Sequence, residues 1–471
     1  MRKIIKIIKR TLKVLVTVLF LLIIILFLSI PYVRYSEREM RQLGTSYKKI
    51  VLQGVNIIPM NTDSIFRSKN IYIENNNIVN ITSDSVFMDG YKAINAKGKY
   101  VIPGLIDMHA HVFDRTDLPQ YLAYGVTTVR NMMGFPMHLR WKEQLKEDKI
   151  VGANLTTATP TINSGNNAGP FHKTVNNAQE VTLALERYMK EGYDFVKVYD
   201  DVDSLQLNII EGILVKKNVQ IAGHPPKVSL GRLLNSSLIS IEHTEELLKF
   251  LDEERSEESM RALAKKLKAH NKAVTLNLVA FNRIYKISHE GEVYYQNLQK
   301  ARLNPLTKFI GKKQLEVYTK AGPKYKAFTE AKYRAMEILS RILTEEGVIV
   351  LFGTDSGPNF IAAGASVIEE LELLKAAGLS EYDILKSATY NAAEILNNHK
   401  IGRIETNTTA ELLILDDNPL TNLETISKPY MLMFNNKYYS EVQLSKVKTL
   451  GGNKQSMYAT LGLFLEHLIN K

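Results

Sequence analysis

The sequence predicts an α/β protein in which a distorted (β/α)8 (TIM) barrel is joined to a small β-sandwich and preceded by a transmembrane helix. Apolar, β-branched segments alternate with amphipathic helical patterns through the middle of the chain, which is the repeat of a parallel barrel. Short strand patterns separated by turn residues lie on both sides of this repeat and predict the sandwich. A long uncharged segment near the N-terminus predicts the membrane helix.

The composition is that of a globular protein with a full core, and it limits the chemistry that the chain can use. Of the 471 residues, 45% are apolar, and the net charge is +11. Six of the cations lie within the first 13 residues, so the charge of the remaining chain does not predict a nucleic-acid partner. The absence of cysteine excludes disulfides, thiolate metal sites and cysteine nucleophiles. Any metal must therefore be held by His, Asp, Glu or a modified Lys.

Residues 1–40 are predicted to form a cytoplasmic basic stub and a transmembrane anchor. Residues 14–33 are uncharged, and at helical rise this length matches the hydrocarbon core of a bilayer. The cations before this segment predict a single-pass protein with a cytoplasmic N-terminus and an extracytoplasmic catalytic domain. The alternative is a cleaved signal peptide. We expect a retained anchor, because the apolar segment is longer than a usual signal core and no small-x-small cleavage pattern follows it.

The β-sandwich is predicted from residues 41–100 and 401–440, the two flanks of the barrel. Short β-branched runs separated by turns such as Asn75-Asn76-Asn77 favour antiparallel strands in the first flank, and the second flank has the same pattern. Residues 441–471 form a C-terminal extension in which leucines at helical spacing over 457–468 predict a helix, packed on the body or on a partner. A homo-oligomer is one arrangement that the sequence leaves open.

Residues 101–400 are predicted to form the barrel. Helical patterns cover, among others, 178–190, 257–270 and 327–346. The segment 283–326, rich in tyrosine and lysine, interrupts the repeat after the seventh strand and is interpreted as a lid, a membrane-facing element or a solvated excursion. The eight predicted strands are 101–111, 126–133, 155–162, 195–199, 219–224, 238–243, 274–280 and 348–354.

Titratable side chains stand at the ends of several predicted strands, where the carboxyl ends of parallel strands share one rim. His109 and His111 end the first strand, and because residues two apart on a strand point the same way, both imidazoles face one direction. Neutral imidazoles suit zinc and the neighbouring divalent metals. A His-x-His pair alone is weak evidence, but other ligand types stand at the same rim. The full set, which predicts a metal site, is His109, His111, Lys197, His224, His243 and Asp355.

Together with the motifs around it, this set resembles the amidohydrolase superfamily of metal-dependent hydrolases, and more closely its imidazolonepropionase-like and prolidase-like branch. The resemblance covers about residues 50–426. Its most specific motifs are Pro103-Gly-Leu-Ile-Asp-Met-His-Ala-His111, Gly125-Val-Thr-Thr-Val-Arg130, Ile241-Glu-His243, Gly353-Thr-Asp355 and Ala388-Thr-Tyr-Asn-Ala-Ala393.

The resemblance implies two divalent metal ions, expected to be zinc, and a role for each ligand. His109 and His111 would bind the more buried metal, and His224 and His243 the more exposed one. Asp355 would hold the attacking water and act as the catalytic proton acceptor. Two metals that share a water lower its pKa, and a metal also polarises a carbonyl group as a Lewis acid.

Lys197 is the most informative member of the set. The resemblance implies that it is carbamylated by carbon dioxide and bridges the two metals. A lysine on a buried strand is disfavoured as a cation, so its neutral amine is available for this reaction. The alternative, a surface lysine on an edge strand, is disfavoured by the apolar neighbours Phe195, Val196 and Val198. Imidazolonepropionase proper uses one metal without this lysine, so Lys197 favours the two-metal, prolidase-like members.

Three further residues are predicted substrate contacts, each with a structural alternative. His172 lies on a glycine-rich loop after the third strand, which could fold over the site or stay exposed. Tyr199 shares a strand face with Lys197 and could meet the substrate or pack in the barrel. Arg130 closes the second strand and could hold a substrate carboxylate or a structural acid, the second being favoured. Glu242 points to the opposite strand face from its neighbouring ligand and is expected outside the pocket.

These features predict a membrane-anchored hydrolase that cleaves a C–N bond of a small molecule, in an amide, a cyclic amide or an Xaa-Pro-type peptide. Pro225-Pro226 and the loop 163–172 depart from the arrangement expected of a proline dipeptidase, which leaves the substrate open. One alternative is the same site acting on an ester, lactone or phosphoester. The other is a non-catalytic, membrane-tethered binding protein, against which the intact set of six ligands argues.

Overall fold

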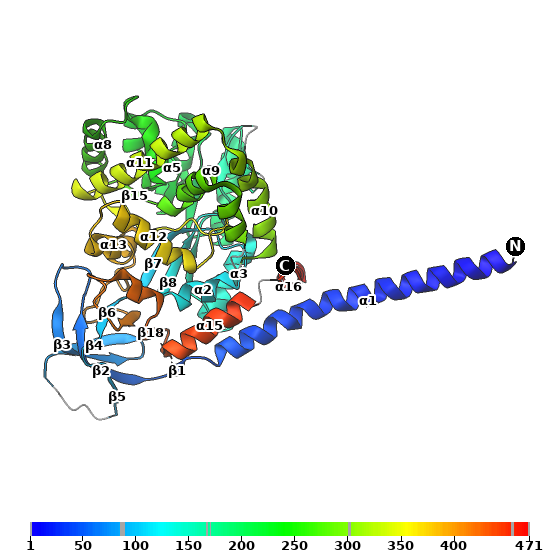
Figure 1. The fold of residues 1–471 in the computed structure, drawn as a ribbon, viewed down its shortest axis with the longest axis horizontal. Coiled ribbons are helices and arrows are strands. Elements are labelled where there is room, and N and C mark those ends of the chain that lie inside the picture. Colours follow the sequence, from blue (N-terminus) through cyan, green and yellow to red (C-terminus); the bar gives the residue numbers. More distant parts are fainter. Residues whose placement is uncertain are drawn as a thin grey trace.

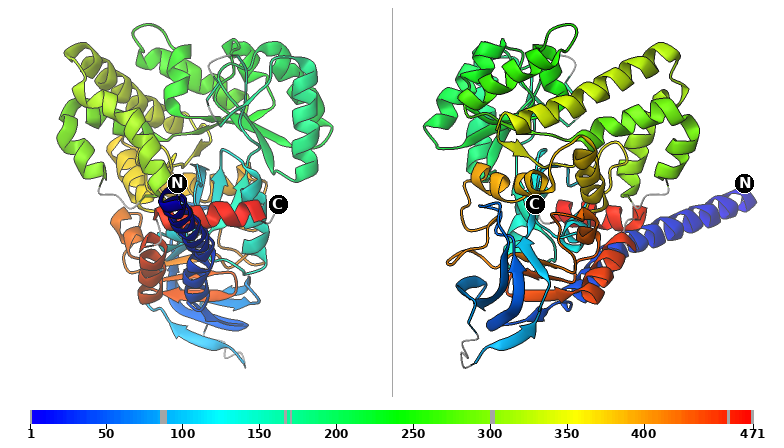
Figure 2. Two further views of the ribbon diagram at one scale, coloured as in Figure 1. Left: turned by 90° about the vertical axis from the view of Figure 1, so that its right-hand side faces the viewer. Right: turned by 60° about the vertical axis from the view of Figure 1, so that its left-hand side comes forward.

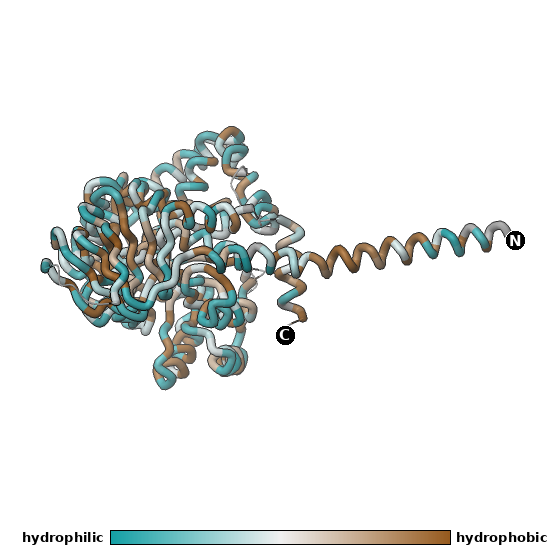
Figure 3. The backbone as a smooth tube through the Cα atoms, turned by 90° about the horizontal axis from the view of Figure 1, so that it is seen from below, coloured by the Kyte–Doolittle hydropathy of each residue, from teal (hydrophilic) through white to brown (hydrophobic). Residues whose placement is uncertain are grey.

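The computed structural model describes residues 2–84, 90–165, 168–169, 171–299, 303–453 and 456–469. Helix α1 (Arg2–Arg41) projects from a body that contains the remaining elements (Figure 1). Its residues Ile8–Arg41 are long and apolar enough to cross a membrane, and Figure 3 shows the continuous apolar stretch. A signal sequence passes the same test, so the retained anchor stays a prediction.

The two flanks of the chain meet in one nine-stranded sheet. β17 of the second flank pairs antiparallel with β6 of the first, so that Leu412 lies opposite Pro103. One buried cluster, which includes Ile50, Val101 and Leu412, packs against this sheet. The order of the strands is β1 (Thr45–Ser46), β19 (Lys437–Ser440), β18 (Met431–Phe434), β17 (Leu412–Leu415), β6 (Tyr100–Pro103), β2 (Lys49–Ile57), β3 (Phe66–Glu74) and β4 (Asn77–Thr82), with β5 (Lys92–Asn95) paired to β2.

The first strand predicted for the barrel, 101–111, is divided at Gly104. Residues before this glycine form β6 of the nine-stranded sheet, and β7 (Leu105–Ala110) belongs to a separate parallel sheet. A Cβ atom at position 104 would lie 2.4 Å from the side chain of Thr127, so only glycine allows the chain to pass this point. The prediction of one continuous strand was wrong, because the two halves pair with different partners: β6 pairs with β17 and β2, and β7 pairs with β8.

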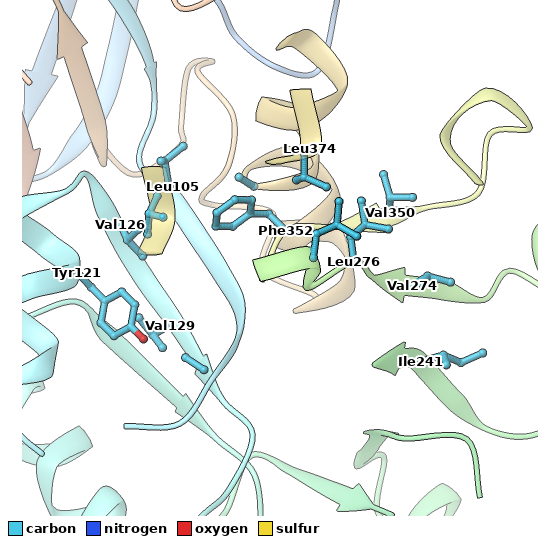
Figure 4. Packing of buried hydrophobic residues seen from close by; sticks show 14 of the residues in the cluster. Leu105, Tyr121, Val126, Val129, Ile241, Val274, Leu276, Val350, Phe352 and Leu374 are labelled. Atoms are coloured by element: carbon cyan, nitrogen blue, oxygen red, sulfur yellow. The ribbon is translucent and has the colours of Figure 1, made fainter. Parts of the chain in front are cut away.

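The middle of the chain forms two parallel sheets that carry the predicted alternation of strands and helices. Isolated parallel bridges join the sheets at both seams, Ala110 with Ser356 and Ala158 with Phe195. Side chains of both sheets pack in one apolar core (Figure 4). This is the arrangement that a distorted barrel requires, and its full closure stays a prediction. One sheet contains β7, β8 (Val126–Asn131) and β9 (Asn154–Thr157); the other contains β11 (Lys173–Thr174), β10 (Ile162–Asn163), β12 (Phe195–Val198), β13 (Gln220–Gly223), β14 (Leu238–Glu242), β15 (Ala273–Thr275) and β16 (Val350–Leu351).

Helices follow most of the strands and cover the outside of the two parallel sheets (Figures 1 and 2). The helices predicted at 178–190, 257–270 and 327–346 are confirmed as α4, α8 and α11. The bounds are α2 (Asp117–Ala123), α3 (Pro136–Lys146), α4 (Ala178–Glu191), α5 (Ser204–Val215), α6 (Leu230–Leu234), α7 (Thr244–Leu247), α8 (Glu257–Ala269), α9 (Leu278–Gln299), α10 (Pro305–Leu315), α11 (Pro323–Glu345), α12 (Ala365–Ala376), α13 (Glu381–Ser387), α14 (Tyr390–Ile395), α15 (Glu441–Asn453) and α16 (Met457–Ile469).

The seventh predicted strand, 274–280, is too long, because α9 already begins at Leu278. The buried carboxylate of Glu370 on α12 accepts hydrogen bonds from the backbone amides of Leu278 (2.9 Å) and Val279 (2.7 Å). These two amides belong to the first turn of α9, where amides have no partner within the helix. The segment 283–326, predicted as an interruption, is largely this helix and α10, with 300–302 outside the described residues.

We expect Glu370→Ala to lower the free energy of unfolding by about 2 kcal/mol, because two buried amides lose their acceptor. Urea denaturation of the purified chain measures the change. Glu372→Ala, which removes an exposed glutamate from the same helix, is the matched control and should leave the midpoint unchanged. Equal stabilities of the two variants would contradict the capping role of Glu370.

Candidate metal centre

His109 and His111 stand at the carboxyl end of β7, beside Asp355, which follows β16. Nε2 of His111 lies 3.0 Å, and Nε2 of His109 3.4 Å, from Oδ1 of Asp355. The three residues offer ligand atoms that all lie within 4.8 Å of one another. Two imidazoles and a carboxylate form a donor set that suits zinc and its neighbours.

Hydrogen bonds between the two strand ends hold this group together. The backbone amide of Asp355 donates to the carbonyl oxygen of His109 at 2.7 Å. Asp107, two residues before His109, accepts hydrogen bonds from Oγ1 (2.6 Å) and the amide (3.1 Å) of Thr354. Asp355 itself has a φ of 50°, in the left-handed region that non-glycine residues seldom adopt. Such a conformation persists where the surrounding contacts determine it, as the hydrogen bonds do here.

The orientation of His109 is set by a buried ion pair behind it. Nδ1 of His109 lies 2.8 Å from Oε2 of Glu242, and Arg130 donates to Oε1 of the same carboxylate at 2.8 Å. All three side chains are buried. Histidine ligands commonly donate their second ring N–H to a carboxylate, which directs the other nitrogen at the metal. Glu242 lies outside the cavity, as expected. Arg130 was also predicted as a substrate contact; this position does not support that role, because the guanidinium is buried against Glu242.

His224, His243 and Lys197 approach the same place from the neighbouring strands. The ring centroids of His224 and His243 are 4.7 Å apart, and those of His109 and His243 are 4.5 Å apart. Lys197 is 2% exposed and lines the same cavity as His224 and His243. The structure therefore brings all six predicted ligands together, and their ligand roles stay predictions.

Asp200 is a residue of the site that the sequence analysis did not identify. Its Oδ1 lies 3.1 Å from Nδ1 of His224, the position that Glu242 has toward His109. Nδ1 of His224 is also 3.9 Å from Glu246, and these three residues form a second group with ligand atoms within 4.8 Å. In the sequence, the available signal was an acidic residue three positions after Lys197, just beyond the end of β12.

Burial controls the protonation of the basic groups. Desolvation lowers the pKa of His109 and of His224 well below the usual value, and lowers that of His243 to about 4. Desolvation also lowers the pKa of Lys197 to about 8. The histidines are therefore neutral at pH 7, and the amine of Lys197 loses its proton more readily than in water. Both properties favour coordination and carbamylation.

Asp355 stays ionised despite its burial. Desolvation alone would raise the pKa of its carboxyl, but the hydrogen bond with His111 and the electrostatic attraction of the surrounding basic side chains, Lys197 among them, outweigh it, so the pKa is lowered. Nε2 of His109, directed at this carboxylate, is buried and has no hydrogen-bond partner within the described ranges. A buried ring nitrogen without a partner is costly unless a cation binds it. The residues present thus fit a divalent metal.

A cavity of about 480 Å³ opens in front of these ligands. His172 and Tyr199, both predicted substrate contacts, line it with ring centroids 4.6 Å apart. Its wall also carries aromatic side chains such as Phe113 and Phe171, and it includes residues of α9 and α10 from the segment 283–326, for which a lid was one of three interpretations. The positions of His172 and Tyr199 are compatible with substrate contact.

Comparison with known proteins agrees with this geometry. Residues 326–438 match the model of the family described as the Amidohydrolase family. The chain superposes on a bottromycin amidohydrolase with a TM-score of 0.72 and 22% identity, covering 90% of this chain and 93% of that one. The family match covers the last part of the barrel region and the second flank, and the structural similarity shows a shared fold.

Other solved structures share this fold. A putative prolidase from Bifidobacterium longum has a TM-score of 0.65 and 20% identity, over 84% of this chain and 95% of the prolidase. A Xaa-Pro dipeptidase has a TM-score of 0.65 and 16% identity, over 83% of this chain and 100% of the dipeptidase. In sequence, the chain is 28% identical over 152 residues to an adenine deaminase of Clostridium perfringens, a match that spans 29% of this chain and only 26% of the deaminase.

We expect Glu242→Gln to weaken metal binding by roughly 10- to 100-fold, because His109 loses its charged partner. Competitive titration with a chromophoric chelator measures the dissociation constant. Glu257→Gln, on the exposed surface of α8, is the control and should bind metal as the wild type does. An unchanged affinity in Glu242→Gln would show that this carboxylate does not orient a ligand.

Proposed function

We propose that this chain is a membrane-anchored amidohydrolase, an enzyme that hydrolyses a C–N bond with two divalent cations, expected to be zinc. The observation that carries the proposal is the convergence of one lysine, one aspartate and four histidines from five strand ends at one cavity. A structural role would not require five of these six side chains to line the cavity. When bound, the cations would supply an acidified water and a Lewis acid for the scissile carbonyl group.

Four imidazoles would hold the cations. His109 and His111 lie next to Asp355, and by the family resemblance this pair would take the more buried cation, while His224 and His243 would take the other. Glu242 and Asp200 fix one histidine of each pair through its Nδ1 atom. Their carboxylates select the tautomer that leaves Nε2 free for coordination.

Lys197 would complete the site as a carbamate. In this reaction the neutral amine attacks the carbon of CO2, a C–N bond forms, and one proton leaves the nitrogen. The burial that lowers the pKa of the amine to about 8 favours the reacting form. The product is a carbamate anion with two oxygen donors, whereas an unmodified, protonated lysine would be a cation.

Asp355 would move the proton. Its ionised carboxylate lies against His111 at the floor of the cavity, where it can accept a proton from the attacking water. The same carboxyl group can then donate this proton to the leaving nitrogen. Tyr199 and His172, on the cavity wall, would orient the substrate.

An amide or peptide bond is the favoured substrate class. The similar structures named as an amidohydrolase, a prolidase and a Xaa-Pro dipeptidase share this fold, and their names are the reason for proposing this class. The same groups would also serve an ester, lactone or phosphoester. A screen of dipeptides, N-acyl amino acids, cyclic amides and lactones with the metal-loaded protein separates these classes. Failure to bind metal under replete conditions would instead favour the non-catalytic binding protein.

We expect Lys197→Ala to lose bound metal and activity, and to regain part of both when a short carboxylate such as propionate is added. The carboxylate would occupy the place of the carbamate. Metal per chain, measured by elemental mass spectrometry, and native intact mass, which detects the bound CO2, are the readouts. Lys190→Ala, an exposed lysine on α4, should behave as the wild type. Unchanged metal content in Lys197→Ala would exclude the bridge.

We expect Asp355→Asn to keep its metal and to lower kcat by about 100-fold or more, because the amide cannot accept the proton. Turnover of whichever substrate the screen identifies is compared with metal content in the same preparation. Asp417→Asn, at an exposed turn, is the control. Full activity with normal metal content would remove Asp355 from the proton-transfer role.

A further inference from the structure

Helix α16 has two faces of different character. One face packs on α1, where Val33 is buried with Ala459 and Leu463. A Cβ at Gly462 would lie 2.4 Å from the carbonyl oxygen of Ser29, so the two backbones approach closely, as small residues allow between membrane helices. The opposite face exposes large apolar side chains to the surroundings, namely Met457, Phe464, Leu468 and Ile469.

The contact with α1 places α16 beside the apolar span. The hydroxyl of Tyr458 donates to the carbonyl oxygen of Ile25 at 2.8 Å, and its ring lies 5.3 Å from that of Tyr32. Both partners belong to the uncharged segment 14–33. At the other end of the contact, Arg34 pairs with Glu466 at 2.9 Å, where charged residues resume. A tyrosine pair followed by an ion pair is typical of the membrane–water boundary.

Helix α10 adds a second apolar and basic face. Phe309 is 56% exposed, and Val317, just after the helix, is 68% exposed. Lys312 and Lys313 lie on the same face and are also exposed. α10 and α16 both lie on the side of the body from which α1 projects (Figures 1 and 2). Aromatic side chains between lysines suit the headgroup region of an anionic bilayer.

Polar contacts join these helices to one another and to the loop that follows His111. Nδ2 of Asn304, at the start of α10, lies 2.8 Å from Oγ1 of Thr460 on α16 and 2.6 Å from Oδ2 of Asp114. Arg115, the next residue, pairs with Glu466 of α16 at 2.9 Å. The segment that contains Asp114 and Arg115 follows His111 directly. The helices and this loop therefore form one connected unit.

We propose that α10 and α16 form a membrane-contact surface that seats in the headgroup region of an anionic phospholipid bilayer. The inference rests on the proposal that α1 spans that bilayer. Thr307 and Gln314 on α10 line the cavity, so the contact would hold one wall of the cavity against the membrane. A second copy of the chain is a less suitable occupant, because exposed lysines on α10 favour an anionic surface and α16 already lies along the span.

The absence of cysteine gives a direct test, because one engineered cysteine labels a single position of the full-length chain. The variants Phe464→Cys on α16 and Phe309→Cys on α10 are labelled with a fluorophore in vesicles of phosphatidylcholine and phosphatidylglycerol. Doxyl-labelled lipid quenches a label in contact with the bilayer, and iodide quenches one in water. Leu205→Cys, an exposed apolar position on α5, is the aqueous control. Leu21→Cys, within the apolar span, reports whether α1 is inserted.

We expect both surface labels to be quenched by the doxyl lipid and to have iodide quenching constants several-fold below that of Leu205→Cys. If the Leu21→Cys label meets lipid while the other two behave like the control, the contact surface is overturned and the anchor remains. If no label meets lipid, the anchor proposal fails, and the contact surface with it. Protection from iodide without quenching by lipid would assign α16 to contact with a second copy and also overturn the proposal.

Discussion

The junction between the end of β7 and the segment after β16 is the contact on which the metal site depends. These strands belong to different sheets, so the site exists only while the seam between them is closed. Several hydrogen bonds close it, among them those from the amide of Asp355 to His109, from the amide of His111 to Ser356, and from the amide and hydroxyl of Thr354 to Asp107. Each bond involves a predicted ligand or its direct neighbour. The hydrogen bonds that close the seam therefore also hold the predicted ligands in position.

Burial has opposite consequences for the bases and the acids of this site, and both favour metal binding. It lowers the pKa of the histidines, which leaves their ring lone pairs available at neutral pH, and it lowers the pKa of Lys197 to about 8, so this amine loses its proton more readily than in water. Burial would also neutralise Asp355, but the hydrogen bond with His111 and the attraction of the basic side chains around it keep this carboxyl ionised. Neutral imidazoles around an anionic oxygen are electron donors that suit a bound cation. Arg130 does not neutralise this oxygen, because its guanidinium pairs with Glu242.

The residues that form the candidate site could be predicted from the sequence, but the side chains that orient them could not. A period-two strand directs His109 and His111 together, and parallel strands place their carboxyl ends at one rim, so these members follow from local rules. The partners of the ligands follow no such rule. Glu242 is on the wrong face of β14 for the cavity, yet it meets His109 behind the rim, and this contact joins strands of two different sheets. Asp200 likewise becomes a partner of His224 only when β12 and β13 are side by side. The break at Gly104 was also missed, because an apolar strand pattern continues through it while the chain passes from one sheet to another.

The contacts of the two termini could not be predicted either. The sequence predicted a helix at each terminus, and the structure shows that both helices contact the loop next to the site. Arg115 is 2% exposed and pairs with Glu37 of α1 and Glu466 of α16, two residues more than 400 positions apart in the sequence. Removing one partner of a buried ion pair costs about 3–5 kcal/mol, so neither terminal helix can leave without disturbing this arginine. Arg115 follows His111 by four residues, in the loop that carries Phe113 into the cavity wall. The position of α1 is thus coupled through one buried charge to the loop that begins at the predicted metal ligands. This coupling is consistent with the proposal that the cavity is held at a membrane surface, because a body joined to α1 by a free linker would not need it.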